Sequence, residues 1–450
     1  MSIVAHTLTL EEKLQAQKEL APAIYGNVDY SLKPERFADA PDDESYLGRN
    51  QLHLRPALIA DKDRVAFIRA YTFIGDAEAD AYAGLMKDFG FRPLVNMLMQ
   101  ACDHGIDSVP DCPDELRAFI AAMEYVPEWL DMDLVEQGAR IERNGTAHLL
   151  PFLIRGGLFA TFRNKYAALP MAVTNNLASN TAERRIKETA TFFATSTLPN
   201  ALTRFGPGFH AAAMVRLMHS MVRTNIMRSP NTWDTSVYGV PIPQVDQMPA
   251  GMFGMLLLSY QVLAEGRTEF SPAERARVEF ARYRCVLLGL PEDLLSDTPQ
   301  GIVDLMVARG GTLRAGFEEE TCGELLKAVM AANLRKDNSI GSRIFEKFER
   351  SFSKVFFVQK FESGDRKGAA KKGVKVSGFD YFLAGLTGMY VQSRMKRHAR
   401  ALKDPAQREE ADRRAVRRIR AMLASFGHAE FTTDASNYRK SARGKAAAQT

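Results

Sequence analysis

The 450-residue chain is predicted to fold as an all-α protein. Apolar residues recur at spacings of three and four along most of the chain, which is the repeat of one helix face. Almost no segment alternates with a period of two, as half-buried strands do. Proline, glycine and asparagine separate the helical segments, and capping residues stand where several of the helices would begin.

The predicted helices follow one another through short loops. Residues 61–90 are expected to form two helices joined by a turn. Further helices are expected in "PDELRAFIAAMEYV", "DMDLVEQGARIERNG", "SPAERARVEFARYRCVLLGL", "TPQGIVDLMVARGG" and "CGELLKAVMAANLRK". The first three of these begin with a cap or proline signal and end near glycine or proline, which fixes their approximate bounds.

Composition divides the chain into three zones. Residues 1–60 are polar and contain several prolines, and we expect an arm that is laid across a surface or partly mobile. Residues 61–335 carry the dense helical pattern and form the expected main domain. Residues 336–450 contain a Gly/Lys-rich linker, "FESGDRKGAAKKGVKVSG", a basic helical pair and a tail whose last dozen residues we expect to be disordered.

The overall composition is that of a globular protein, with 46% hydrophobic and 25% charged residues. The four cysteines form no CxxC pair, which argues against a zinc site or a disulfide framework. The start of the chain lacks the basic and apolar segments of an export signal. The most apolar window, "MPAGMFGMLLLSYQVLA", is marginal for a membrane span and typical of a buried helix. We therefore expect a soluble cytoplasmic protein.

Positive charge is concentrated at the C-terminus. From Arg394 to Thr450 there are 15 Lys and Arg against six Asp and Glu, a balance of +9 within a total of +5, which leaves −4 for the first 393 residues. A basic tail suits nucleic acid, an anionic membrane face or a protein partner, although a solvated surface is its commoner role. We expect no nucleic-acid partner. A peripheral membrane contact through this basic region and the oligomeric state both stay open.

One amphipathic helix carries an unusual polar stripe. In residues 211–228, "AAAMVRLMHSMVRTNIMR", His219 lies between Arg216 and Arg223 on one face of an otherwise apolar helix. A lone histidine in such a helix is usually a satisfied core residue, and protein carboxylates could pair with both arginines. The alternative is one ligand that brings a metal and carboxylates together. Haem b is such a ligand, because its iron binds imidazole and its propionates bind guanidinium groups.

A second candidate segment precedes this helix. Residues 143–182 contain no acidic residue, which indicates a large apolar region, and the charged stretch "ERRIKETATFFATSTLPN" follows. In it, Arg185 and Thr189 are four residues apart and share a helix face, with Glu188 beside them. An ordinary solvated helix start would have the same pattern, so this segment alone does not decide a function.

These motifs resemble those of the latex-clearing-protein and MpaB-type oxygenases, which share the rubber oxygenase catalytic domain. The family pattern is an Arg-x-x-His-x-x-x-Arg helix, here "RLMHSMVR", preceded by an Arg-x-x-Lys-Thr helix, here "RIKET". The segments "WDTSVYGVPIPQVDQMPAGMF" and "RYRCVLLGLPEDLLSDTPQGIVDLM" also resemble the family's later blocks. The likeness extends over residues 61–316.

The resemblance implies a globin-like helical core that holds one haem b, with additional helices and a basic helical C-terminal extension outside the likeness. It makes His219 the axial iron ligand, with Arg216 and Arg223 supporting the haem through its propionates. Arg185 and Thr189 would face the dioxygen-binding side. The family's lysine position is taken by Glu188, while Lys187 lies one place earlier, about 100° around the helix. Glu188 could then supply a proton-transfer group.

The expected function is that of a haem-dependent, dioxygenase-like oxidoreductase. It would use O₂ on a hydrophobic, unsaturated small lipid or isoprenoid, by oxidative cleavage of a C=C bond or a related oxygenation. The alternative is a non-catalytic haem or lipid carrier or sensor on the same scaffold. A third hypothesis is a haem-free helical interaction module, in which Arg216 and Arg223 pair with protein acids.

Overall fold

The computed structural model describes residues 8–173, 179–229, 232–335 and 339–426. These residues form helices and two isolated β-bridges, without a strand among them, so the all-α prediction is confirmed. The first seven residues of the predicted arm and the tail that was expected to be disordered lie outside the described ranges. None of the described helices combines the length and the apolar composition of a membrane span.

The chain forms two compact units, each built from two separate stretches. Unit 1 consists of residues 1–138 and 202–315, and unit 2 of residues 139–201 and 316–450. The zones expected from composition are consecutive in sequence, with boundaries near residues 60 and 335. The compact units are instead interleaved, because the chain leaves unit 1 within helix α9 and later returns to it.

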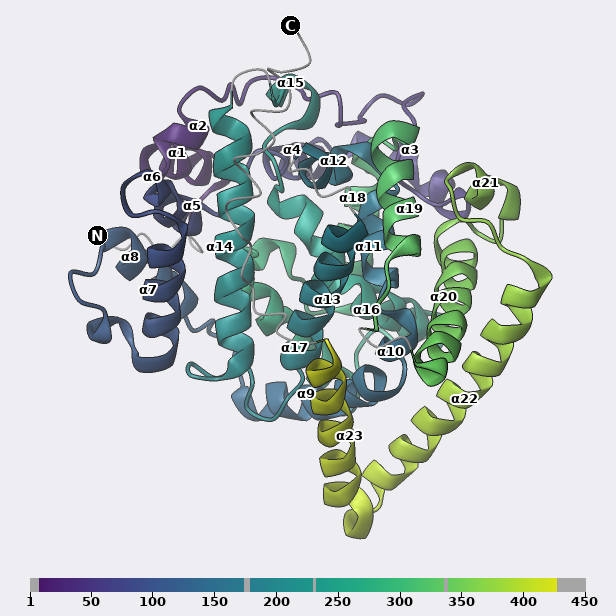
Figure 1. Ribbon diagram of the computed structural model, residues 1–450. Coiled ribbons are helices and arrows are strands. Elements are labelled where there is room, and N and C mark those ends of the chain that lie inside the picture. The colour runs from purple at the N-terminus through teal and green to yellow at the C-terminus, as the bar shows by residue number, and fades with distance from the viewer. Residues whose placement is uncertain (1–7, 174–178, 230–231, 336–338, 427–450) are drawn as a thin grey trace, which may run out of the picture. The chain divides into compact units, whose positions relative to one another are not determined.

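Unit 1 is built from short and medium helices, and Figure 1 labels its α-helices. They are α1 (Leu10–Leu20), α2 (Pro22–Tyr25), η1 (Arg49–Leu54), α3 (Arg55–Ala60), α4 (Lys62–Ala70), α5 (Ala77–Gly84), α6 (Met86–Phe89), α7 (Phe91–His104), η2 (Ile106–Ser108), α8 (Asp114–Met123), the start of α9 (Met132–His148), α14 (Pro207–Arg228), α15 (Thr235–Tyr238), α16 (Gln244–Ala264), α17 (Pro272–Leu287), η3 (Glu292–Leu294) and α18 (Pro299–Thr312). The predicted helices of this unit correspond to α4, α5, α8, α9, α17 and α18.

The helices of unit 1 begin where the sequence supplies partners for their first free N–H groups. Thr9 and Glu12 form a capping box at α1, and Ser271 and Glu274 form another at α17. The N-cap of α5 is Asp76, whose side chain accepts a hydrogen bond from the Ala79 N–H. This aspartate also bonds to α14, as described below.

Unit 2 contains the remaining helices. They are the end of α9, α10 (Leu150–Leu153), α11 (Gly156–Phe162), α12 (Lys165–Val173), α13 (Ser179–Thr195), the π-helix η4 (Glu319–Gly323), α19 (Glu324–Ala331), α20 (Ile340–Phe361), α21 (Arg366–Lys371), α22 (Gly378–Lys403) and α23 (Pro405–Ser425). The Gly/Lys-rich segment predicted as a linker differs in one respect. It forms the short helix α21 and buries Ala369 and Val374, so part of it belongs to the core.

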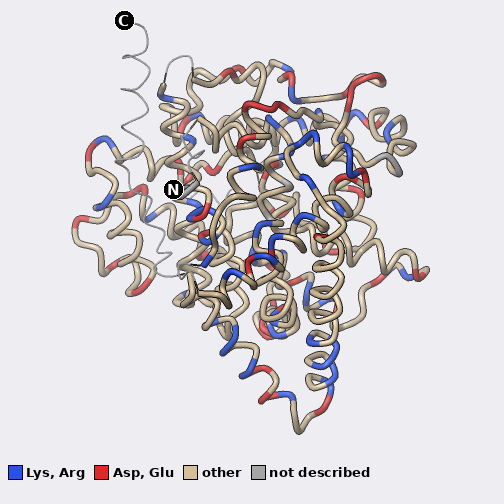
Figure 2. Tube along the Cα trace, turned by 45° about the vertical axis from the view of Figure 1, so that its right-hand side comes forward, with Lys and Arg blue, Asp and Glu red and all other residues tan. Residues whose placement is uncertain are grey.

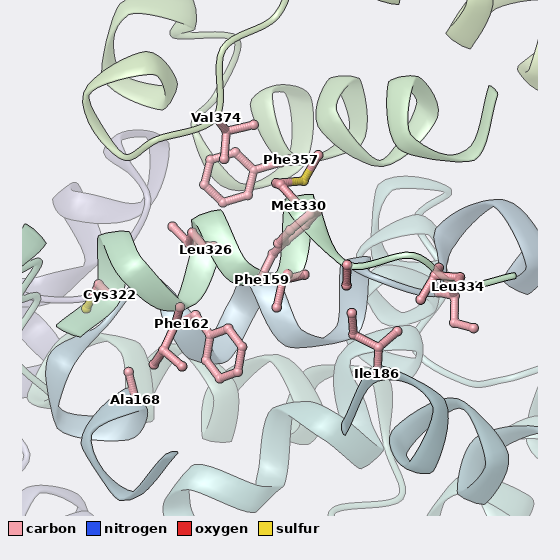
Figure 3. Close-up of a cluster of buried hydrophobic side chains, with 14 of the residues drawn as sticks. Phe159, Phe162, Ala168, Ile186, Cys322, Leu326, Met330, Leu334, Phe357 and Val374 are labelled. Carbon is pink, nitrogen blue, oxygen red and sulfur yellow. The ribbon is translucent and has the colours of Figure 1, made fainter. Parts of the chain in front are cut away.

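The core of unit 2 joins segments far apart in sequence. Buried side chains of α11, α13, α19 and α20 meet in one cluster, part of which is drawn in Figure 3. The rings of Phe159 and Phe357 pack edge to face with centroids 5.3 Å apart. Because Phe159 and Phe357 are both fully buried, this contact stabilises the packing of α20 against α11.

His148, at the end of α9, is expected to make the stability of unit 2 depend on pH. Arg418 Nη1 lies 2.9 Å from His148 Nδ1, and the ring of His398 lies 5.6 Å away between centroids. Burial, together with His398 and Arg394, lowers the pKa of His148 from 6.5 to about 4. The unfolded chain therefore takes up this proton at a higher pH than the folded chain. The contribution of the neutral His148 to the free energy of unfolding is complete above pH 6.5 and is lost as the pH falls toward 4.

The replacement His148→Gln should flatten this pH dependence. Urea unfolding above and below the interval is expected to give a smaller loss of the free energy of unfolding for the variant than for the wild type. The exposed His53 provides the control, because His53→Gln should leave the pH dependence of the wild type unchanged. Equal slopes for wild type and His148→Gln would contradict the assignment.

Candidate functional site

Helix α14 carries the three residues predicted to bind the cofactor. It begins at Pro207, whose fixed φ suits the first turn of a helix, and 15 of its 22 residues are buried. His219 is partly buried, whereas Arg216 and Arg223 are almost fully buried, at 4% and 0% exposure. Both arginines must therefore find anionic partners inside the protein.

Those partners are two aspartates of α5, which lies beside α14 (Figure 1). Arg216 Nε and Nη2 donate to the two carboxylate oxygens of Asp76, each at 2.7 Å. Arg223 Nη1 donates to Asp80 Oδ1, and its other nitrogens donate to the carbonyl oxygens of Pro241 and Ile242 at 2.9 and 2.8 Å. Each aspartate thus neutralises one arginine, and together they hold α14 against α5.

A tyrosine also bonds to the ion pair between Arg223 and Asp80. The Tyr25 hydroxyl donates to Asp80 Oδ2, and Tyr25, Asp80 and Arg223 are all at 0% exposure. Burial, with the charge of Asp80 next to it, raises the pKa of Tyr25 well above its usual value, so the hydroxyl keeps its proton. Burial disfavours the charge of Arg223, but the carboxylate of Asp80 outweighs it and raises the pKa of Arg223.

Two glycines leave room for these ion pairs. A Cβ at Gly75 would lie 1.9 Å from the Tyr25 hydroxyl oxygen. Gly289 has a φ of 83°, and a Cβ there would lie 2.9 Å from both Arg216 Nε and Asp76 Oδ2. Only glycine combines this backbone conformation with this close approach at no steric cost.

The variant Gly289→Ala is therefore expected to lose about 2–3 kcal/mol of stability, from the positive φ and from displacement of the Arg216–Asp76 pair. Gly266 is a matched control, because its φ is 72° and nothing lies within 4 Å of its Cβ position. Gly266→Ala should cost only about 1 kcal/mol, the backbone term alone. Equal losses in denaturant unfolding would show that Gly289 is not packed against the ion pair.

His219 is oriented by a relay of two glutamines from α16. Its Nδ1 lies 3.3 Å from Gln247 Oε1, and Gln247 Nε2 donates to Gln244 Oε1 at 3.2 Å. Gln244 Nε2 in turn donates to the carbonyl oxygens of Gly75 and Gly289 at 2.8 and 3.0 Å. Because each amide nitrogen is used as a donor, Gln247 presents its oxygen to the imidazole. The ring then carries its proton on Nδ1 and its lone pair on Nε2.

The residues predicted for the dioxygen side lie on α13, in unit 2. Glu188 is buried, and its two oxygens accept from Arg184 Nε at 2.9 Å and from Arg185 Nη1 at 3.1 Å. Lys187 is also buried and pairs with Glu183 at 2.5 Å. Thr189 is partly buried on the next position. The structure thus joins Arg185 to Glu188 within unit 2, while His219, Arg216 and Arg223 belong to unit 1.

The comparisons with known proteins agree with this arrangement of helices. Residues 146–336 match the model of a protein family described as ER-bound oxygenase mpaB/B'/Rubber oxygenase, catalytic domain. The predicted resemblance to this family is confirmed. A solved structure, described as latex clearing protein LCP in the closed state, has a similar fold, with a TM-score of 0.56 and 17% sequence identity over 79% of this chain and 91% of that chain. No curated protein matches the chain.

The match to the rubber oxygenase catalytic domain includes both α13 and α14. The matched part of the chain is thus similar to a family described as an oxygenase catalytic domain. The aspartates that neutralise Arg216 and Arg223 precede the matched residues, on α5. Among the described residues, no cluster of three or more His, Cys, Asp or Glu side chains could hold a metal ion.

The role that the family resemblance implied for Arg216 and Arg223, support of a haem through its propionates, stays a prediction. Each of the two guanidinium groups is bonded to a buried aspartate. This is the other alternative that the sequence left open, pairing with protein acids. The physical reason is that neither arginine reaches solvent, so a partner within the fold must be present at all times.

Four residues of the site were not predicted from the sequence. Asp76 and Asp80 lie in "GDAEAD", four residues apart, whereas Arg216 and Arg223 are seven residues apart. Gln244 and Gln247 lie in "PQVDQM", within a block already noted for its family likeness. Nothing in the sequence indicated that the aspartates meet the two arginines or that the glutamines face His219.

Proposed function

We propose that this protein is a haem-b-dependent oxygenase that uses O₂ on a hydrophobic, unsaturated lipid or isoprenoid. The reaction would be the oxidative cleavage of a carbon–carbon double bond or a related oxygenation. The observation that carries the proposal is the orientation of His219 by Gln247, because a histidine that binds a metal donates its other ring N–H to a fixed acceptor. The family match supports the oxygenase class.

The residues fit a haem that would be held by one imidazole nitrogen of His219. A porphyrin supplies four nitrogens to its iron, so one imidazole nitrogen suffices as the protein's ligand. Nε2 of His219 carries the lone pair in the tautomer set by Gln247, and the neighbouring buried side chains of α14 include Leu217, Met218 and Met221. When bound, the haem would supply the binding and activation of dioxygen.

Arg216 and Arg223 receive a different role from the one first expected. We assign them as positioning residues, because they hold α14 against α5 one turn before and one turn after His219. Haem propionates would need other donors, since both of these guanidinium groups are already paired. The chemistry of the axial ligand does not depend on those donors.

On α13, we propose that Arg185 and Thr189 donate hydrogen bonds on the dioxygen side, as the family likeness implies. Glu188 would hold Arg185 in place, because one of its oxygens accepts from that guanidinium group. Proton transfer by Glu188 would require one of its two arginine contacts to open. A variant Glu188→Gln keeps the shape and removes the charge, and we expect it to slow turnover while haem binding is retained.

Two measurements on the purified full-length protein test the proposal. A Soret band, a haem b content of one per chain by the pyridine haemochrome method, and a shift of the band when the reduced protein meets CO are expected. Oxygen uptake is then compared with squalene and with its saturated analogue squalane, which has the same carbon skeleton without double bonds. We expect oxygen uptake with squalene and none with squalane. A protein that fails to bind added haem would refute the proposal, and a haem protein that consumes no oxygen with any unsaturated lipid would be a carrier or sensor.

A further inference from the structure

Unit 2 contains a basic pocket that the proposed oxygenase function does not use. It has a volume of about 590 Å³ and lies between residues 333–335, one face of α20 and the first turn of α22. Five cations line it, namely Arg335, Arg343, Lys347, Arg350 and Lys354. Four of these lie on α20 at spacings of four, three and four residues, so their side chains share one helix face.

The two acidic side chains that line the pocket, Asp380 and Glu346, already accept hydrogen bonds. Asp380 caps α22 by accepting from the Ser377 N–H at 2.8 Å, accepts from Ser351 Oγ at 2.9 Å, and lies 3.4 Å from Lys354 Nζ. Glu346 accepts the backbone N–H of Arg335 at 2.9 Å. The next acid along α20, Glu349, is buried and bonded to Arg155 Nε at 2.8 Å. The pocket therefore carries an excess of positive charge.

Three of the cations have no carboxylate partner within the described part of the chain, namely Arg343, Lys347 and Arg350. Arg350 Nε is buried there without any hydrogen-bond partner. Burial, with the charge of Arg155 nearby, lowers the pKa of Arg350. Three cations without a carboxylate partner around one pocket favour an anion that enters it.

Aromatic rings hold two of the cations at the wall of the pocket. Lys347 Nζ lies 4.9 Å from the centre of the Phe379 ring, and the Arg335 guanidinium lies 4.4 Å from the centre of the Phe345 ring. These contacts favour the charged side chains without neutralising them. The cations thus keep their charge at the wall of the pocket, where several negatively charged oxygens of one phosphate-bearing group could bind them.

An exposed apolar stripe begins at the same pocket. Phe379 lines the pocket and starts a row on α22 that continues with Phe382, Leu386, Met389 and Tyr390. Phe382 and Met389 are 60% and 63% exposed. At 3.6 residues per turn the five side chains lie within an arc of about 100°. A contiguous row of large apolar side chains on a surface marks an interaction site.

We propose that the pocket binds the headgroup phosphomonoester of an anionic phospholipid of the phosphatidylinositol phosphate class, while the apolar stripe of α22 lies in the membrane interface. The cations match the headgroup charge, and the stripe, which a free phosphate compound would not need, matches the acyl region beside it. Further cations along α22 and α23, seen as repeated blue segments in Figure 2, would add attraction to the same surface. This inference does not rest on haem binding or on oxygenase activity.

Vesicle co-sedimentation of the full-length protein tests the proposal. Phosphatidylcholine vesicles are compared with vesicles that contain phosphatidylinositol phosphate, and with phosphatidylserine vesicles of equal charge. The wild type should bind the phosphatidylinositol phosphate vesicles most tightly. The double variant Arg343→Gln/Lys347→Gln, at two exposed positions, should bind them about tenfold to thirtyfold more weakly. Phe382→Ser/Met389→Ser should weaken vesicle binding but leave the affinity for soluble inositol trisphosphate unchanged.

The matched control removes two exposed cations from α23, as Arg413→Gln/Arg417→Gln. If the control lost as much vesicle affinity as the pocket variant, the binding would come from the overall positive charge of the protein, and the pocket assignment would be overturned. Binding to phosphatidylserine that equals binding to phosphatidylinositol phosphate would overturn it as well. A protein that binds soluble inositol trisphosphate but no vesicle would have a site for a free phosphate compound, and a stripe variant that turns a dimer into a monomer would assign the stripe to a second copy. Either result would refute the membrane proposal.

Discussion

Replacement of Asp80 by alanine is expected to lower the free energy of unfolding by about 3–5 kcal/mol. The change removes the carboxylate that pairs with Arg223, and the guanidinium group is at 0% exposure, where water cannot replace the lost partner. The hydroxyl of Tyr25 loses its acceptor at the same time. Removing one member of a buried pair is costly because the remaining charge is uncompensated, whatever the net contribution of the intact pair.

Two companion variants show whether the buried charge causes this loss. Asp80→Leu combined with Arg223→Met removes both charges, and it should regain much of the stability that the single replacement loses. The surface residue Glu410, which pairs with Arg413 and Arg417, provides the control. Glu410→Ala should cost less than about 1 kcal/mol. Denaturant unfolding measures all four proteins, and a loss below about 1 kcal/mol for Asp80→Ala would contradict the burial of this pair.

Replacement of His219 by alanine is expected to abolish haem binding and oxygen uptake while the protein stays folded. The imidazole is only partly buried, and the Asp76 and Asp80 ion pairs that fix α14 are left in place. Loss of His219 would remove the proposed bond between the protein and the haem iron. The Soret absorbance of the variant should therefore fall to a small fraction of the wild-type value.

The same helix supplies a control. His210 lies nine residues earlier on α14, and its Nδ1 is 3.2 Å from a carboxylate oxygen of Asp103. His210→Ala should keep the haem content and the CO-difference spectrum of the wild type. If both variants lost haem equally, the loss would reflect a change in α14 as a whole, and His219 would not be singled out as the ligand.

Much of the helical architecture could be predicted from local sequence. The positions of α8, α17 and α18 follow from capping residues, proline and apolar spacing, all of which act within a few residues. The polar stripe of α14 was visible for the same reason, because a helix places Arg216, His219 and Arg223 on one face. These signals are local, and they do not depend on how distant segments pack.

The partners of that stripe could not be predicted, because they depend on contacts between distant segments. Arg216 and Asp76 are 140 residues apart in sequence, and Arg223 and Asp80 are 143 apart. Nothing local distinguishes an arginine that meets an aspartate from one that meets a propionate. The interleaving of the two units and the pocket between α20 and α22 were hidden for the same reason.

The central claim is that Nε2 of His219 binds the iron of a haem, and chemical rescue tests it most directly. The variant His219→Gly leaves a cavity where imidazole can enter. Absorption spectra of the haem-reconstituted variant are recorded before and after the addition of imidazole, in the reduced state with CO. Without imidazole we predict little of the absorption band that the reduced wild type shows with CO. With imidazole we predict the wild-type band. A variant that shows the wild-type spectrum before any imidazole is added would contradict the claim.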